Sequence, residues 1–95
     1  MEYLVTMTTQ VPAGTPAEAV DDVRAREAAP SRELAAQGHL LRLWAVPGQG
    51  RTLGLWQAGD VAEMEAIVDS LPLAPWMTTQ VTPLSQHSSD PAAGR

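Results

Sequence analysis

Hydrophobic and polar residues follow one another along the chain in a pattern that predicts four strands. Residues 2–8 are rich in β-forming side chains and predict a first strand. Residues 39–46 and 51–57 predict two further strands, which the intervening Pro-Gly turn joins into a hairpin. Residues 77–83 predict a fourth strand. The remaining residues, 85–95, are small and polar, and we expect this tail to be mobile unless it packs on a neighbouring chain.

The segment between the first and second strands carries the signals of a long helix. Thr15, followed by Pro16 and Glu18, matches a capping box with proline at the first helical position. Gly38 is a natural residue just past a helix end. Pro30 lies inside the segment and predicts either a kink or a break into two pieces.

A second helix is predicted between the third and fourth strands. Asp60 and Glu63 form another capping box, and the helix is expected to run to about Ser70, with Pro72 just beyond it. At 100° per residue its apolar side chains fall on one uninterrupted stripe, formed by Val61, Met64, Ile67, Val68 and Leu71.

The resulting order, β-α-β-β-α-β, predicts an α+β protein with the ferredoxin-like fold. We expect residues 1–84 to form one domain, in which a four-stranded antiparallel sheet carries two helices on one face. The other face of such a sheet would be bare. A second copy of the chain would cover it, so a homo-oligomer is expected, a dimer or larger.

The first helix places one carboxylate where an apolar residue is expected. Val20, Val23 and Leu34 define its apolar stripe, and Glu27 falls in the middle of that stripe. A glutamate is seldom buried without a partner. It could be a general acid or base whose pKa is raised by burial, or it could hold a polar atom of a substrate. The alternatives are a salt bridge to a buried arginine, or a helix rotation at Pro30 that exposes the side chain.

Two further residues of the predicted hairpin are candidates for catalysis. Arg42 interrupts an apolar strand, where the alternation of side chains places it on one face with Leu40 and Trp44. It could bind a carboxylate or enolate oxygen. It could equally be a surface residue or the partner of Glu27. His39 begins the same strand on its other face, where a solvent-exposed role is the alternative to a catalytic one.

Aromatic side chains are few, and phenylalanine is absent. Trp44, Trp56 and Trp76 supply most of the aromatic bulk, and they could line a pocket for a flat or hydrophobic ligand, or simply fill a core or interface. His39 and His87 are the only histidines, with no cysteine and no close cluster of carboxylates, so no metal site is expected.

Composition narrows the function further. The chain has 95 residues and a net charge of −5, which argues against nucleic-acid or anionic-membrane binding. Cysteine and lysine are both absent, which excludes thiolate nucleophiles and lysine Schiff bases. No stretch is apolar enough for a membrane span, and the N-terminus lacks the layout of a signal peptide, so we expect a cytoplasmic protein.

Several short motifs together resemble the muconolactone isomerase family over nearly the whole chain. The most specific is Leu71-Pro72-Leu73-x-Pro75-Trp76-Met77. The others are Val5-x-Met7-Thr8, Glu27 followed by Gly38, Leu43-Trp44-x-x-x-Gly48, and His87 in the tail. The resemblance implies a ferredoxin-like subunit in a ring-shaped homo-oligomer, typically a decamer. It also implies a cofactor-free and metal-free enzyme that moves a double bond in a small lactone by proton abstraction and return.

The chain departs from this family at three positions. The family commonly has a histidine and a basic residue where this chain has Leu4 and Thr6, and an arginine where it has Ala45. Arginine or lysine would stabilise a substrate carboxylate or enolate. The pocket implied by the resemblance, with Leu4 and Thr6 in its wall, is therefore less suited to an anionic lactone.

Four functions remain open. The first is an isomerase-like enzyme that acts by proton transfer on a small-to-medium, fairly hydrophobic substrate, by double-bond shift, cyclisation or dehydration, for example in secondary metabolism. Glu27 would be its acid/base, and Arg42 or His39 would stabilise negative charge. The second is an authentic muconolactone isomerase of aromatic catabolism. The third is a non-catalytic ligand-binding or assembly protein on the same scaffold, and the fourth is a cofactor-free dimeric oxygenase of similar topology.

Overall fold

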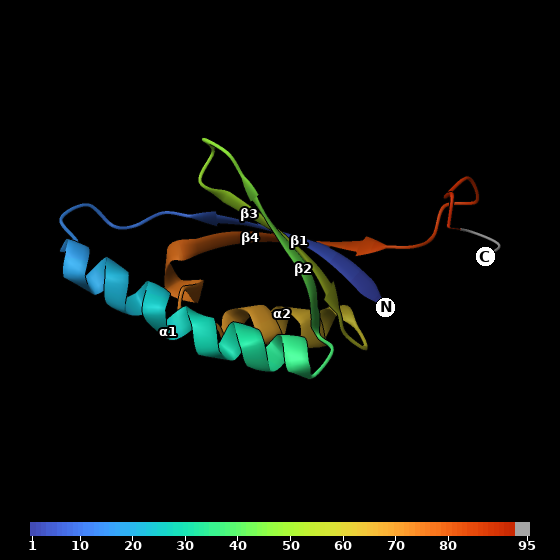
Figure 1. Cartoon of the computed structure of the whole chain (residues 1–95), viewed down its shortest axis with the longest axis horizontal. Helices are drawn as coiled ribbons and strands as arrows, with labels where there is room; N and C mark the ends of the chain where they lie inside the picture. The colour runs from blue at the N-terminus through green and yellow to red at the C-terminus, as the bar shows by residue number, and fades with distance from the viewer. Residues whose placement is uncertain (93–95) are drawn as a thin grey trace.

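A single four-stranded antiparallel sheet organises the chain, and the computed structural model describes residues 1–92 of it. The strands lie in the order β2-β3-β1-β4, with both helices on one face of the sheet (Figure 1). The predicted ferredoxin-like α+β fold is thereby confirmed. The elements in chain order are β1 (Glu2–Thr9), α1 (Ala17–Ala36), β2 (Leu40–Val46), β3 (Arg51–Gln57), α2 (Val61–Asp69), a 3-10 turn (Ala74–Trp76) and β4 (Met77–Leu84).

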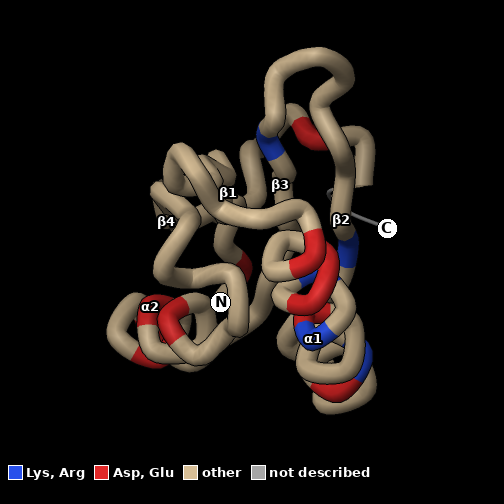
Figure 2. Tube along the Cα trace, turned by 90° about the vertical axis from the view of Figure 1, so that its left-hand side faces the viewer, with Lys and Arg blue, Asp and Glu red and all other residues tan. Residues whose placement is uncertain are grey.

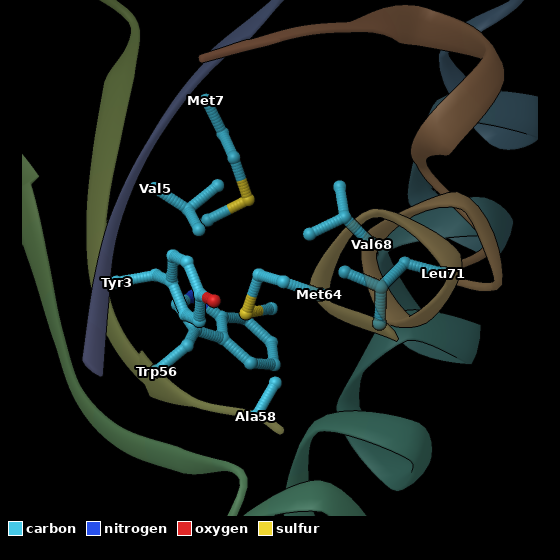
Figure 3. Close-up of a cluster of buried hydrophobic side chains, with 8 residues drawn as sticks. All are labelled: Tyr3, Val5, Met7, Trp56, Ala58, Met64, Val68 and Leu71. Atoms are coloured by element: carbon cyan, nitrogen blue, oxygen red, sulfur yellow. The ribbon is translucent and has the colours of Figure 1, made fainter. Parts of the chain in front are cut away.

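The hydrophobic core lies between α2 and the two central strands. Helix α2 packs beneath the β4 side of the sheet and α1 beneath the β2 side (Figure 2). Alternate residues of β1 point into the space between, where they meet Trp56 and the buried face of α2 (Figure 3). The eight buried residues are Tyr3, Val5, Met7, Trp56, Ala58, Met64, Val68 and Leu71. Helix α1 contributes no fully buried residue, so its packing on the sheet is looser than that of α2.

Helix α1 differs from the prediction in two ways. It runs without a break over 20 residues, with Pro30 inside it. Its N-cap is Pro16, without a side-chain cap, because the Thr15 hydroxyl instead donates to the carbonyl of Pro12 at 2.7 Å. The predicted capping box at Thr15 is therefore wrong, and of the two outcomes predicted at Pro30, a kink or a break, the break does not occur.

The end of α1 and the start of α2 follow the predictions. Gly38 has φ +83° and completes a Schellman motif, in which the N–H of Gly38 donates to Ala35 and that of His39 donates to Leu34. The Asp60 carboxylate accepts from the N–H of Glu63 at 2.8 Å, as expected for an N-cap. Of the apolar stripe of α2, Met64, Val68 and Leu71 are buried, Ile67 is partly buried, and Val61 at its start remains 44% exposed.

Strand β2 contains an irregularity that the alternation of its residues did not predict. Leu40 pairs with Trp56, but Arg42 pairs with Leu55, so one extra residue is inserted at Leu41. The bulge places Leu40 against the core and Arg42 on the opposite face of the sheet. The predicted sharing of one face by Leu40 and Arg42 is therefore wrong.

The described residues include no helix that is both long and apolar enough to cross a membrane. After Leu84 the chain continues to residue 92 in turns, without a helix or strand, and leads away from the sheet (Figure 1). The last three residues of the predicted tail, 93–95, lie outside the described residues.

Candidate active site on the helical face of the sheet

Glu27 lies on the face of α1 that turns toward the sheet. The partly buried residues of α1 are Val20, Val23, Glu27, Pro30, Ser31 and Leu34, which is the stripe that the helical period predicts. The side chain of Glu27 accepts a hydrogen bond at 3.0 Å from the backbone N–H of Leu73, in the segment that leads to β4. Within residues 1–92 the one ion pair joins Arg26 to Asp22, so no guanidinium neutralises Glu27 there.

The environment of Glu27 favours its protonated form. Partial burial removes water from the carboxylate and raises the pKa of Glu27 above its ordinary value. The hydrogen bond from Leu73 has the opposite effect, because it stabilises the carboxylate, but it does not cancel the effect of burial. A raised pKa brings a carboxyl group closer to the range in which it can both accept and return a proton.

Glu27 borders two adjoining hollows. The inner hollow has a volume of about 120 Å³, and its wall is mostly apolar, with Met7, Leu43, Trp56, Leu71, Leu73 and Met77 among the residues that line it. The outer hollow, of about 570 Å³, opens beside the β2–β3 hairpin. Thr9, Glu27, Thr52 and Leu73 line both. The carboxyl group therefore stands at the junction of an apolar recess and a wider, more open space.

Three hydroxyl residues of the inner hollow escaped the sequence interpretation. Ser31 lies one turn after Glu27 on α1, and its hydroxyl donates to the Glu27 carbonyl at 2.9 Å. Thr9 and Thr52 enter from the ends of β1 and β3. The signals were present in the sequence, because Ser31 is four residues from Glu27 on a helix and Thr52 shares a strand face with Trp56.

Trp56 forms part of the wall between this hollow and the core. The side chain is 1% exposed, and its indole Nε1 is buried with no hydrogen-bond partner. A buried donor without a partner costs about 1–3 kcal/mol of stability. Gly54, two residues earlier on the same strand face, makes room for the ring, because a Cβ at that position would lie only 2.2 Å from Nε1.

Four of the other candidate residues lie on the opposite, open face of the sheet. Thr6 pairs with Leu53 and Leu4 with Leu55, both outside the core, and Trp44 and Arg42 pair with the same two β3 residues from the other side. The Arg42 guanidinium stacks over the Trp44 ring, 5.3 Å from its centroid. Within one chain, Arg42, Trp44, Leu4 and Thr6 are therefore separated from Glu27 by the sheet.

The remaining candidates lie at the edges of the helical face. The His39 ring approaches the Gln57 carbonyl at 2.8 Å, at the end of the hairpin strands opposite to the Pro-Gly turn. Trp76 lies between Leu73 and Met77 but is not itself among the residues lining the inner hollow. His87 is exposed in the tail, where its ring accepts from the N–H of Ser89. Of these nine residues, the chain brings together Glu27 and Trp56.

Fold and site together define a small α+β protein whose helical face carries a partly buried carboxyl group over an apolar hollow. A family model described as muconolactone delta-isomerase matches residues 1–90. The muconolactone delta-isomerase of Cupriavidus pinatubonensis is 36% identical over 94% of this chain and 97% of its own length. The muconolactone delta-isomerase 1 of Acinetobacter lwoffii is 33% identical over 94% of this chain and 93% of its own length. The chain belongs to the muconolactone delta-isomerase family and is an isomerase-like enzyme.

Solved structures agree with this fold. A muconolactone isomerase superposes with a TM-score of 0.85 at 24% identity, covering 95% of this chain and 94% of that one. The 5-chloro-2-hydroxyhydroquinone dehydrochlorinase of Burkholderia phenoliruptrix, solved with 2,5-dihydroxybenzoquinone, superposes with a TM-score of 0.64 at 18% identity, over 92% and 96% of the two chains. At these identities the two likenesses establish the architecture alone.

Proposed function

We propose that this protein is a cofactor-independent isomerase in which Glu27 transfers a proton within a small-to-medium, fairly hydrophobic substrate. The observation that carries the proposal is the position of Glu27. Its carboxyl group is partly buried, has no cationic partner in the described chain, and stands where two hollows meet. A base that lacks a counter-charge and touches an open cavity is available to a substrate.

The reaction is an allylic shift of one proton. The ionised Glu27 takes a proton from a carbon next to a C=C bond that is conjugated with a lactone carbonyl. The electron pair of that C–H bond spreads over the system onto the carbonyl oxygen, and a dienolate forms. The neutral Glu27 then returns the proton to the other end of the allylic system, so the double bond moves without oxidation or reduction.

The shape of the site supports a fairly hydrophobic substrate. The inner hollow, of about 120 Å³, is smaller than the usual ligand pocket of several hundred Å³ and suits one small ring. The outer hollow offers room for a larger substituent. We therefore place the reacting ring in the inner hollow and the remainder of the molecule in the outer one. A substrate of this kind would suit a double-bond shift, cyclisation or dehydration in secondary metabolism.

Muconolactone itself is the second candidate substrate. The relatives named as muconolactone delta-isomerases favour it, and so does Arg24, which lies one turn before Glu27 on α1 and lines the outer hollow. A guanidinium there could pair with the carboxylate of an anionic lactone. Direct assay with muconolactone decides between the two candidates.

The open face of the sheet supports a homo-oligomer. Trp44, on this face, is 41% exposed, and Leu41, at the bulge of the edge strand β2, is 39% exposed. Apolar surface of this kind is usually covered by a partner. We propose that a second copy of the chain covers this surface. Arg42, on the same face, would then stabilise negative charge in the site of the neighbouring subunit and not in its own.

Exchange with heavy water tests the proposal. In D₂O the enzyme should place deuterium at the allylic carbons of an unsaturated lactone, because the proton on Glu27 can exchange with solvent before it is returned. Proton NMR of the lactone follows the exchange. A protein that binds the lactones but neither exchanges nor isomerises any of them would be a binding protein on this scaffold.

A further inference from the structure

We propose that the indole N–H of Trp56 donates a hydrogen bond to the carbonyl oxygen of the bound lactone, opposite Glu27. This inference rests on the proposed function and assigns a second reacting-atom contact to the same site. It begins from a group that the fold leaves unused, the buried Nε1 of Trp56 with no partner among the described residues. Almost every buried polar group in a protein is hydrogen-bonded, so such a donor calls for an explanation.

The N–H edge of the ring lies over Gly54, on the side of β3 that leads to the inner hollow. The strand register pairs Tyr3 with Trp56 and Met7 with Thr52, and Gly54 lies between these two positions on β3. Nε1 and Cδ1 are the ring atoms closest to Gly54. The pyrrole edge therefore lies on the side of Trp56 that leads along β3 to Thr52, and Thr52 and Met7 line the inner hollow with Trp56.

Leu43 is the side chain that covers this edge. Its Cδ2 lies 3.2 Å from the point where a Gly54 Cβ would stand, close to the indole nitrogen. Leu43 is 47% exposed on the edge strand β2, so packing leaves its side chain free to turn. A turn of Leu43 would uncover the N–H from the side of the hollow, whereas the rest of the ring stays in the buried core with Tyr3 and Val5.

A donor at this place fits the chemistry of an allylic proton shift. Negative charge gathers on the carbonyl oxygen when the proton leaves, and a fixed donor there stabilises the charge in a site that excludes water. Indole donates without being able to accept a proton, so it cannot compete with Glu27 as the base. The nitrogen is already desolvated, so substrate binding need not remove water from it.

The test observes the indole N–H resonances directly. The probes are muconolactone and a neutral butenolide without its carboxylate, added to ¹⁵N-labelled Glu27→Gln, which is expected to bind but not to turn over. The resonance of Trp56 should shift downfield on binding, and by more than those of Trp44 and Trp76. Binding without a change at Trp56 would overturn the inference and leave the proposed function standing. If neither lactone binds, no lactone carbonyl stands opposite Glu27 and the inference is overturned, whereas the proposed function is judged by the deuterium exchange of the wild type.

Kinetics gives an independent readout. Trp56→Phe retains an aromatic ring and removes the donor, so kcat should fall about a hundredfold, as on loss of one donor to an oxyanion, with KM little changed. Glu33→Gln, on the exposed side of α1, is the control and should retain kcat. Trp56→Phe could also weaken the core. A second variant therefore carries at position 56 a tryptophan analogue in which sulfur replaces the indole N–H, which keeps the ring volume, and its kcat should fall by the same factor. A wild-type kcat in the enzyme that carries this analogue would contradict the inference.

Discussion

The side chain of Glu27 accepts a hydrogen bond from the backbone N–H of Leu73, 46 positions further along the chain. This contact ties the middle of α1 to the segment between α2 and β4, and it fixes the direction of the carboxyl group at the junction of the two hollows. A glutamine could accept the same hydrogen bond through its amide oxygen. The charge of Glu27 can therefore be removed with little change in the geometry of the site.

Activity should depend on pH through Glu27. The base must be ionised to take a proton, so kcat/KM should fall toward acid pH. Because burial raises the pKa of Glu27, the midpoint of this fall should lie above the value of about 4.3 for an ordinary glutamate. A pH–rate profile of the wild type checks the position. A midpoint at or below the ordinary value would contradict the desolvation of Glu27 in the free enzyme.

The free energy of unfolding should also depend on Glu27, but folding favours its protonated form, whereas activity requires its ionised form. The pKa of Glu27 is higher in the folded chain than in the unfolded chain, so between these two values the folded state binds more protons. Its stability relative to Glu27→Gln should therefore decrease as the pH rises through this window. Urea unfolding of both proteins at about pH 4 and about pH 7 measures the difference. If the stability of the wild type relative to Glu27→Gln increased toward neutral pH, the predicted direction of the pH dependence would be contradicted.

Gly54→Ala should destabilise the fold. The new Cβ would lie 2.2 Å from Nε1 of Trp56, and a ring that is 1% exposed has no free space into which to move. We expect a loss of about 1–3 kcal/mol in the free energy of unfolding. Gly59→Ala is the matched control, because the nearest atom to its Cβ is a Glu63 oxygen at 3.7 Å. Equal stability of the two variants in urea would show that the Trp56 ring is not held over Gly54.

The two helices should respond differently to loss of their predicted caps. Asp60→Ala removes the acceptor for the N–H of Glu63 and should cost about 1 kcal/mol. Thr15→Ala removes no cap, since the Thr15 hydroxyl donates to Pro12 on the surface, and it should cost clearly less. Thermal unfolding of the two variants provides the comparison. A larger loss of stability in Thr15→Ala than in Asp60→Ala would favour the capping box at Thr15 over the contact with Pro12.

The open face of the sheet should hold the subunits together. Trp44→Asp puts a charge on that face and should reduce the mass of the particle, measured by analytical ultracentrifugation. Ala62→Asp, on the exposed side of α2, is a control that places the same charge on the helical side of the sheet, away from the open face. A monomeric wild type would overturn the proposed oligomer, and an unchanged mass for Trp44→Asp would exclude Trp44 from the interface.

Local periodicity was enough to predict the fold and the direction of Glu27. Four strand-like segments, two helical segments and the glycine after α1 specify the topology, and the 3.6-residue period places Glu27 with Val20, Val23 and Leu34 on the inner face of α1. These features depend on neighbours within a few residues along the chain. They can therefore be predicted from a single sequence.

The rest of the site depends on long-range pairing. The bulge at Leu41 reverses the side of the sheet on which Arg42 lies, and the run Leu-Leu-Arg-Leu contains no glycine or proline to announce it. The partner of Glu27 is a backbone N–H, which every residue except proline possesses, so no side chain identifies Leu73 as the donor. The orientation of the Trp56 ring depends likewise on Gly54 and Leu43, which meet it only in the folded sheet.

The most direct measurement of the central claim is the turnover number of Glu27→Gln with a lactone that the wild type isomerises. The variant keeps an acceptor for the N–H of Leu73 and loses the base, so kcat should fall by a factor of about 10²–10⁴ while the variant still folds and binds the lactone. Glu33→Gln, on the exposed side of α1, should turn over like the wild type. A Glu27→Gln variant with wild-type kcat would contradict the account.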